Sequence, residues 1–129
     1  MRQLLLAVIL TVVPIGIFAG LYHVVAPHQA TTAGLGNLES LKAIAADVQT
    51  QVDKGDMAAA AVRMTDYESA WDQGQTAIRP LNPTYWGHVD AASDGAIKSL
   101  REPHPAPDQV KRTLATLRAS LDDPSKPVP

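Results

Sequence analysis

The sequence predicts an all-α protein: an N-terminal transmembrane or signal helix followed by a small antiparallel bundle of about four helices. Three observations predict this class. A long uncharged run stands near the N-terminus, and after it apolar residues recur at spacings of three and four, which places them on one face of a helix. No stretch shows the sustained alternation of apolar and polar residues that indicates a half-buried strand. Short connections between the helical segments favour an up-down-up-down arrangement.

Composition limits the classes of protein that fit. The chain has 129 residues, 46% of them hydrophobic, and a net charge of −2, which suits one small globular domain. No surplus of basic residues is present, so nucleic acid is not an expected partner. The absence of cysteine excludes disulfides, thiol chemistry and a cysteine-linked lipid or haem.

The first element is a membrane segment, expected at residues 4–26. Leu4–Tyr22 contains no charged residue, and about 20 helical residues cross a hydrocarbon core of roughly 30 Å. Residues 1–3 form a cytoplasmic stub that carries Arg2, and no Lys or Arg follows before Lys42. The positive-inside rule therefore predicts a single-pass inner-membrane protein whose C-terminal domain lies in the periplasm.

The alternative for this segment is a signal peptide that is cleaved, which would release the domain into the periplasm. Signal peptides usually have a shorter apolar region of about 7–15 residues. The candidate cleavage site ends at Ala26 and is followed by Pro27, a poor residue after a scissile bond. We therefore expect an anchor and keep cleavage as the alternative.

The remaining chain divides into a tether, a bundle and a tail. Residues 27–36 are rich in Pro, Gly, Thr and Ala, which predicts a flexible tether. The bundle is expected at 37–121, and its first helix should begin at a cap, Asn37, and end at Gly55. Residues 122–129 contain three prolines and are expected to be a disordered tail.

The other three helices have start signals of their own. The second is expected at 57–78 with Asp56 as its cap. The third is expected at 83–101, where Asn82 precedes a proline at the first helical position. The fourth is expected at 107–121, after a proline-rich turn.

Four aromatic residues are the most conspicuous candidate cluster. Tyr67 and Trp71 lie four residues apart on one helix face, and Tyr85 and Trp86 begin the next helix across a short loop. We interpret them as the hydrophobic plug of a small bundle, where aromatic pairs add about 0.5–1.5 kcal/mol beyond burial. That interpretation expects both tryptophans to be largely buried. The alternative is a groove that binds a peptide or a small molecule.

Acidic residues border this cluster at Glu68, Asp72 and Asp90. Carboxylates from facing helices build metal sites in bundles, but those sites use a Glu-x-x-His pair that does not occur here. A solvated polar border is therefore expected, with no metal or other cofactor. Neither a nucleophile elbow nor a phosphate-binding loop is present, so we do not expect an enzyme.

A family resemblance rests on two patterns within residues 66–105. The first is acid-x-Glu-x-x-Trp-Asp, and the second is Trp-x-x-Val-Asp followed by Asp-x-Ala-hydrophobic-x-x-Leu-Arg. The matching residues are Asp66, Glu68, Trp71, Asp72, Trp86, Val89, Asp90, Asp94, Ala96, Leu100 and Arg101. In these patterns the chain resembles uncharacterised short envelope proteins of proteobacteria, which also have an N-terminal hydrophobic segment. The resemblance implies a helical envelope protein and no established activity.

Some members of that family are labelled histidine kinases. This chain has no ATP-binding region and is too short to hold one. The function we expect is therefore non-enzymatic: a membrane-anchored periplasmic protein that serves as a protein–protein interaction or accessory module and binds another envelope protein. The alternative is a periplasmic helical bundle that binds a small ligand or a metal.

Overall fold

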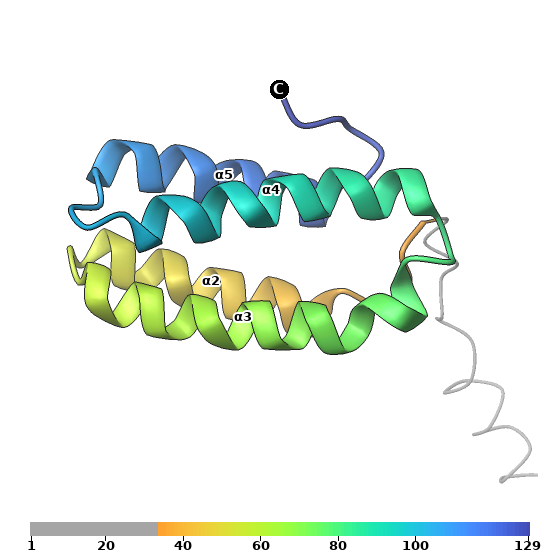
Figure 1. The fold of residues 1–129 in the computed structure, drawn as a ribbon, viewed down its shortest axis with the longest axis horizontal. Coiled ribbons are helices and arrows are strands. Elements are labelled where there is room, and N and C mark those ends of the chain that lie inside the picture. Colours follow the sequence, from red (N-terminus) through yellow and green to blue (C-terminus); the bar gives the residue numbers. More distant parts are fainter. Residues whose placement is uncertain (1–33) are drawn as a thin grey trace, which may run out of the picture. The chain divides into compact units, whose positions relative to one another are not determined.

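The computed structural model describes residues 34–129, which form four helices (Figure 1). They are α2 (Glu39–Asp53), α3 (Met57–Ile78), α4 (Pro83–Arg101) and α5 (Pro107–Asp122). No strand occurs in this part of the chain. The expected all-α class with a bundle of four helices is therefore confirmed for these residues.

The expected membrane segment at residues 4–26 lies outside the described residues, so it stays a prediction. Of the helices within 34–129, none combines the length and the apolar composition needed to cross a bilayer.

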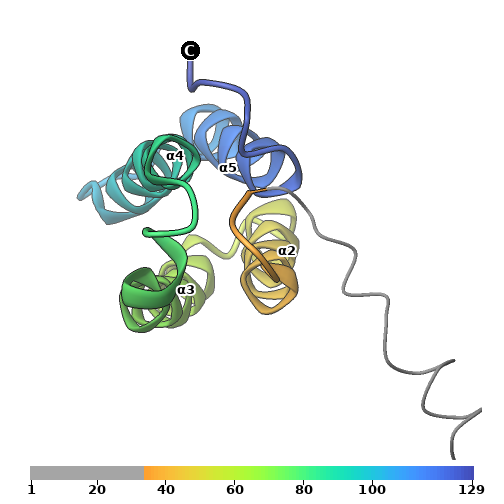
Figure 2. The same ribbon diagram turned by 90° about the vertical axis from the view of Figure 1, so that its right-hand side faces the viewer.

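The four helices run up, down, up and down, and each packs against two neighbours (Figures 1 and 2). Viewed along the bundle, they occupy the corners of a square: α2 contacts α3 and α5, and α4 contacts α3 and α5. In the diagonal pairs, α2 with α4 and α3 with α5, no Cα atoms lie within 8 Å of each other. The α3 and α4 backbones approach least closely of the four neighbouring pairs.

The predicted caps of α3 and α4 are confirmed. The carboxylate of Asp56 accepts a hydrogen bond from the backbone N–H of Ala59 at 2.9 Å. The side-chain oxygen of Asn82 accepts one from the N–H of Tyr85 at 3.1 Å, and Pro83 occupies the first helical turn. Each bond satisfies one of the donors that a helix N-terminus leaves without an intrahelical acceptor.

The start of α2 differs from the expectation. Asn37 precedes the helix by two residues, and its side-chain oxygen accepts from the N–H of Glu39 at 2.9 Å, as in an Asx turn. Leu38 is the cap residue and supplies no side-chain hydrogen bond. The end of α2 agrees with the prediction that Gly55 terminates the helix. Gly55 adopts φ +76°, and its N–H donates to the carbonyl of Val52 at 2.9 Å.

The packed unit extends past the expected bounds at both ends. Leu35 belongs to the expected tether, 27–36, yet only 2% of it is exposed and it lies in the core. Gly36 adopts φ +77°, a conformation that glycine takes without strain, and it lies between the turn that carries Leu35 and α2. In the expected tail, 122–129, Val128 is partly buried against the core.

All four helices contribute to one apolar core. Burying a Val or Leu side chain contributes about 1.5–3 kcal/mol relative to leaving it exposed. Buried alanines on α2, α3 and α4 occupy little space, so helices can approach closely where they face one another. The largest fully buried side chains are Val48, Val52, Tyr67, Val89, Val110, Leu114, Leu117 and Leu121.

Candidate functional site: the α3–α4 seam

The line along which α3 faces α4 holds most of the residues singled out from the sequence, and we call it the α3–α4 seam. Large aromatic side chains lie along the seam, whereas the other helix pairs pack mainly through small or aliphatic side chains. The size of the aromatic side chains accounts for the wider spacing of α3 and α4. The seam is made of Tyr67, Glu68, Trp71, Trp86, Asp90, Ser93, Asp94 and Arg101.

Two stacked indoles join the helices in the seam. The rings of Trp71 and Trp86 have centroids 5.9 Å apart and planes inclined by 10°. Trp71 is only 4% exposed, and Trp86 is partly buried against the core. The expectation that both are largely buried is therefore confirmed for Trp71 and met in part by Trp86. The guanidinium carbon of Arg79 lies 4.8 Å from the centroid of the Trp86 ring, in the geometry of a cation–π contact.

Two hydrogen bonds cross the seam. The indole N–H of Trp71 donates to the Asp90 carboxylate at 2.9 Å. The hydroxyls of Tyr67 and Ser93 are 2.8 Å apart. Ser93 donates its own proton to the Val89 carbonyl at 2.8 Å, so the Tyr67 hydroxyl is the donor to Ser93. These bonds fix the register of α3 against α4.

The environment of Tyr67 keeps its hydroxyl neutral. Burial, with a smaller contribution from the charge of Asp90, raises the pKa of Tyr67 to about 12, although the hydrogen bond with Ser93 opposes the shift. A phenol with so high a pKa acts here as a hydrogen-bond donor and not as a base.

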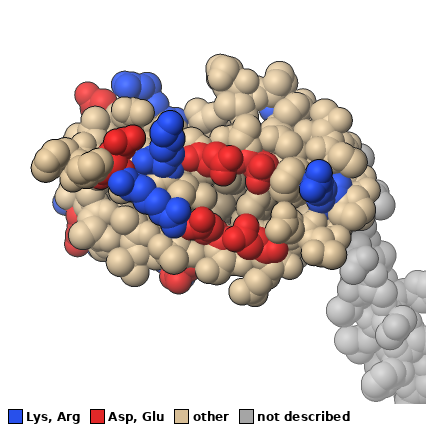
Figure 3. Space-filling view, viewed as in Figure 1, with Lys and Arg blue, Asp and Glu red and all other residues tan. Residues whose placement is uncertain are grey.

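Acidic side chains crowd the outer surface of the seam (Figure 3). Glu68 forms an ion pair with Arg101, with a second contact at 3.4 Å. Partial burial raises the pKa of Asp94, and the charges of Asp90 and Glu68 raise it further. Figure 3 shows Asp and Glu side chains near the middle of the face, with Lys and Arg side chains to either side.

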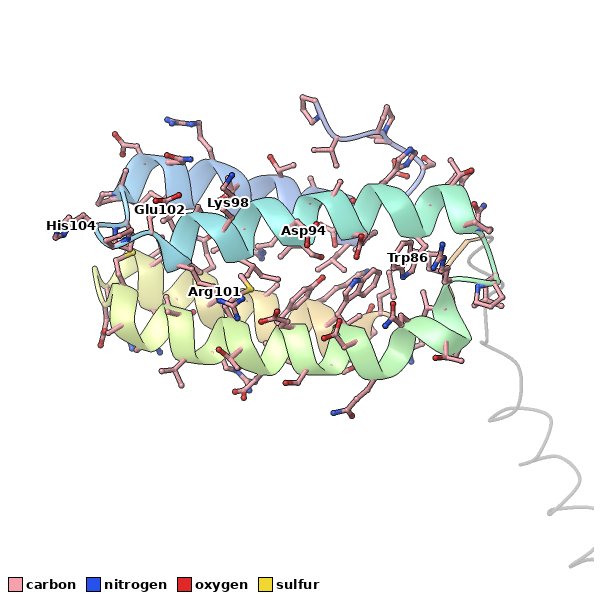
Figure 4. The ribbon with its side chains drawn as sticks, in the orientation of Figure 1. Trp86, Asp94, Lys98, Arg101, Glu102 and His104 are labelled. Carbon is pink, nitrogen blue, oxygen red and sulfur yellow. The ribbon has the colours of Figure 1, made fainter. Side chains whose placement is uncertain are left out.

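Open grooves mark the surface of the described residues, and two of them contain charged side chains. One runs beside the C-terminal half of α4 and mixes both signs of charge around an apolar residue (Figure 4). It is lined by Asp94, Ile97, Lys98, Arg101 and Glu102. The other lies between α2 and α3, where Arg63 is held between Asp47 at 2.7 Å and Asp66 at 3.0 Å. Both are open to solvent, so they suit contact with another surface better than enclosure of a small molecule.

The seam gathers three of the four candidate aromatic residues and leaves out Tyr85. The Tyr85 ring stacks on His88, with centroids 6.3 Å apart, and lies against Gly34. Nδ1 of His88 donates to the carbonyl oxygen of Pro124 at 2.8 Å. Consecutive helical residues point about 100° apart, so Trp86 and Tyr85 cannot both face α3.

The candidate acids have different environments. Asp72 is exposed, Glu68 is paired, and Asp90 is part of the link to Trp71, a role beyond the solvated border expected from the sequence. Sequence reasoning missed the pairing of Trp71 with Asp90 because it depends on the register between two helices. Nowhere in residues 34–129 do three His, Cys, Asp or Glu side chains gather as they would around a metal ion.

The indole N–H of Trp86 is buried in the seam and has no hydrogen-bond partner among the described residues. A buried N–H without an acceptor is costly and is uncommon in native structures.

Within the described residues, fold and site together define a class: a small antiparallel four-helix bundle with an aromatic plug under a charged face. Comparisons of the chain with models of protein families, with curated proteins and with solved structures each gave no match. The resemblance to proteobacterial envelope proteins therefore stays a prediction.

Proposed function

We propose that the chain is a membrane-anchored, non-enzymatic helical module of the bacterial cell envelope that binds another envelope protein. In this proposal residues 4–26 are the anchor, the bundle lies in the periplasm, and the exposed surface of the α3–α4 seam contacts the partner.

The burial of Trp71 is the observation that favours protein binding over a ligand-binding groove. Its ring is stacked and its N–H is already bonded to Asp90, so it serves to join two helices and is not free to bind a ligand. What the seam offers to another molecule is its charged outer surface. Mixed charges of this kind steer association and select a partner of complementary charge, while contributing less to raw affinity.

Site-specific photo-crosslinking in native membranes tests the contact surface. A photo-crosslinking amino acid would replace Asp94 on the seam or Asp72, which lies one helical turn after Glu68 on α3, and, as a control, Lys111 on the exposed side of α5. We expect one envelope protein to be recovered from positions 72 and 94 and not from position 111. Equal recovery from all three positions, or none from positions 72 and 94, would contradict the proposal.

A matched pair of charge reversals tests the contribution of charge. Lys98 and Lys111 are both exposed, on α4 and α5 respectively. Lys98→Glu should weaken crosslinking of the partner, and Lys111→Glu should leave it unchanged. If both variants behave like the parent chain, the charge of the groove that Lys98 lines beside the seam does not select the partner.

Topology is tested separately. A phosphatase that works only in the periplasm, fused after Pro129, should be active, and the full-length protein should stay in membranes after alkaline washing. Activity from a cytoplasmic reporter alone would reverse the orientation. Recovery of a soluble form that starts near Pro27 would replace the anchor with a cleaved signal peptide.

One observation favours the alternative, a bundle that binds a small ligand. The buried N–H of Trp86 could bond to a ligand acceptor. Mass spectrometry of the protein purified from its native membranes would then find a small molecule that is retained by the parent chain and lost from Trp86→Phe. Absence of any such species favours the protein-binding function.

A further inference from the structure

One end of the bundle combines the start of the described chain with an exposed apolar loop, and we call it the entry end. It consists of residues 34–38, the connection 79–82 between α3 and α4, and the end of α5 (Figure 1). Leu81 lies against Gly36 and remains 59% exposed. A single exposed leucine is ordinary on a protein surface. Leu81 is of interest because it lies at the end of the bundle where the described chain begins.

We infer that the entry end rests on the bilayer surface, with Leu81 inserted among the lipid headgroups. This inference rests on the proposed function, because it requires that residues 4–26 anchor the chain. It adds a second contact with the membrane, made by the folded bundle itself.

The length of the connecting chain limits which end can touch the membrane. If the anchor ends at Ala26, residues 27–33 connect it to Gly34, and the eight Cα–Cα steps from Ala26 to Gly34 span at most about 29 Å even when fully extended. The longest helix, α3, has 22 residues and is therefore about 33 Å long. A bundle standing on its opposite end would hold Gly34 farther from the bilayer than the chain can reach.

The side chains at the entry end suit a lipid surface. Leu81 supplies an apolar group, and Arg79 has no carboxylate within ion-pair distance among the residues described, so its charge is available to a lipid phosphate. Trp86 stacks under that guanidinium, and Tyr85 lies beside Gly34. Trp and Tyr are enriched at membrane–water interfaces because their rings are both apolar and polar.

Acidic groups at this end are offset locally. Asp122 lies 3.8 Å from the ammonium of Lys42, and Asp123 lies 3.4 Å from that of Lys126. Hydrogen bonding to Ser125 lowers the pKa of Asp123, which keeps that carboxylate ionised beside its lysine. These pairs reduce the repulsion that free carboxylates would meet at anionic headgroups.

The absence of cysteine from the sequence allows a direct test with single labels. Leu81→Cys and Val62→Cys would each carry an environment-sensitive fluorophore in the full-length chain. Val62 is the matched control, because it is the other exposed large apolar residue of the described chain, at 71%, and lies on α3 in its first two turns, far from the entry end. Melting curves equal to that of the parent chain would establish that both labelled variants are folded.

Both proteins would be reconstituted into vesicles of phosphatidylethanolamine and phosphatidylglycerol, with a fraction of lipids spin-labelled near the headgroup. We expect the label at position 81 to shift to shorter wavelength and to be quenched by the spin-labelled lipid. The label at position 62 should keep the emission it has in water.

The outcomes separate the inference from the proposed function. If alkaline washing strips the protein from the vesicles, the anchor fails and the inference fails with it. If the protein stays but both labels respond alike, whether quenched or not, the anchor stands and contact through the entry end is wrong.

Discussion

Replacing Trp71 with alanine is the most direct test of the aromatic plug. The substitution removes a side chain that is 4% exposed, that stacks on Trp86, and that donates to Asp90. Truncation of a large aromatic residue in a core costs about 3–5 kcal/mol. The unpaired Asp90 lies near the surface and can be hydrated, so its lost hydrogen bond should add little.

That loss is large for a bundle of this size. Domains are stable by roughly 5–15 kcal/mol in total, so Trp71→Ala would remove a large fraction. A loss of 1 kcal/mol lowers Tm by about 4–8 °C in a domain of 60–100 residues, so we expect Tm to fall by at least about 12 °C. The assay is a thermal melt of the full-length chain in mild detergent, followed by circular dichroism.

A second variant separates the hydrogen bond from the packing. Trp71→Phe keeps an aromatic ring in the seam and loses the donor to Asp90, so it should cost clearly less than Trp71→Ala. If Trp71→Ala melts within a few degrees of the parent chain, Trp71 does not hold the bundle together. The seam would then be the first place to look for a ligand.

Three further predictions follow from individual contacts, each measured by unfolding. Asp56→Ala should cost about 1 kcal/mol, because it removes the cap of α3. Burial raises the pKa of Tyr67 from 10.0 to about 12, so its stabilising contribution is complete below pH 10 and is lost as the pH rises towards 12. Tyr67→Phe should weaken that alkaline loss, and an unchanged loss would contradict the assignment. Glu68→Gln combined with Asp72→Asn should cost only about 0–1 kcal/mol, as for exposed ion pairs, and a loss of several kcal/mol would revive a structured acidic site.

Local signals predicted the helices well. The caps at Asp56 and Asn82 act within their own helices, so the sequence is enough to place the starts of α3 and α4. Leu35 precedes the first helical pattern, so the sequence places it in the tether. Only the folded chain shows that it packs into the core, since a turn carries no periodicity.

The candidate site was predicted only in part. The spacing of Tyr67 and Trp71 places them on one face of α3, and Trp86 lies on the facing stripe of α4. The hydrogen bond from Trp71 to Asp90 depends on the axial register between α3 and α4, which the pattern of either helix alone does not determine. Tyr85 adjoins Trp86 in the sequence, which suggests one cluster, but neighbours on a helix point in different directions and Tyr85 lies outside the seam.

The square arrangement of the helices has a consequence for folding. Three of the four packed pairs join helices that are consecutive in the chain, so their contacts form between residues close in sequence. Such low contact order is typical of helical bundles, which fold within microseconds to milliseconds. The remaining pair, α2 with α5, brings together the first and last helices of the bundle, which are far apart in the sequence. The ion pair between Lys42 and Asp122 joins these two helices. We therefore expect α2 and α5 to join late, after the hairpins on either side have formed.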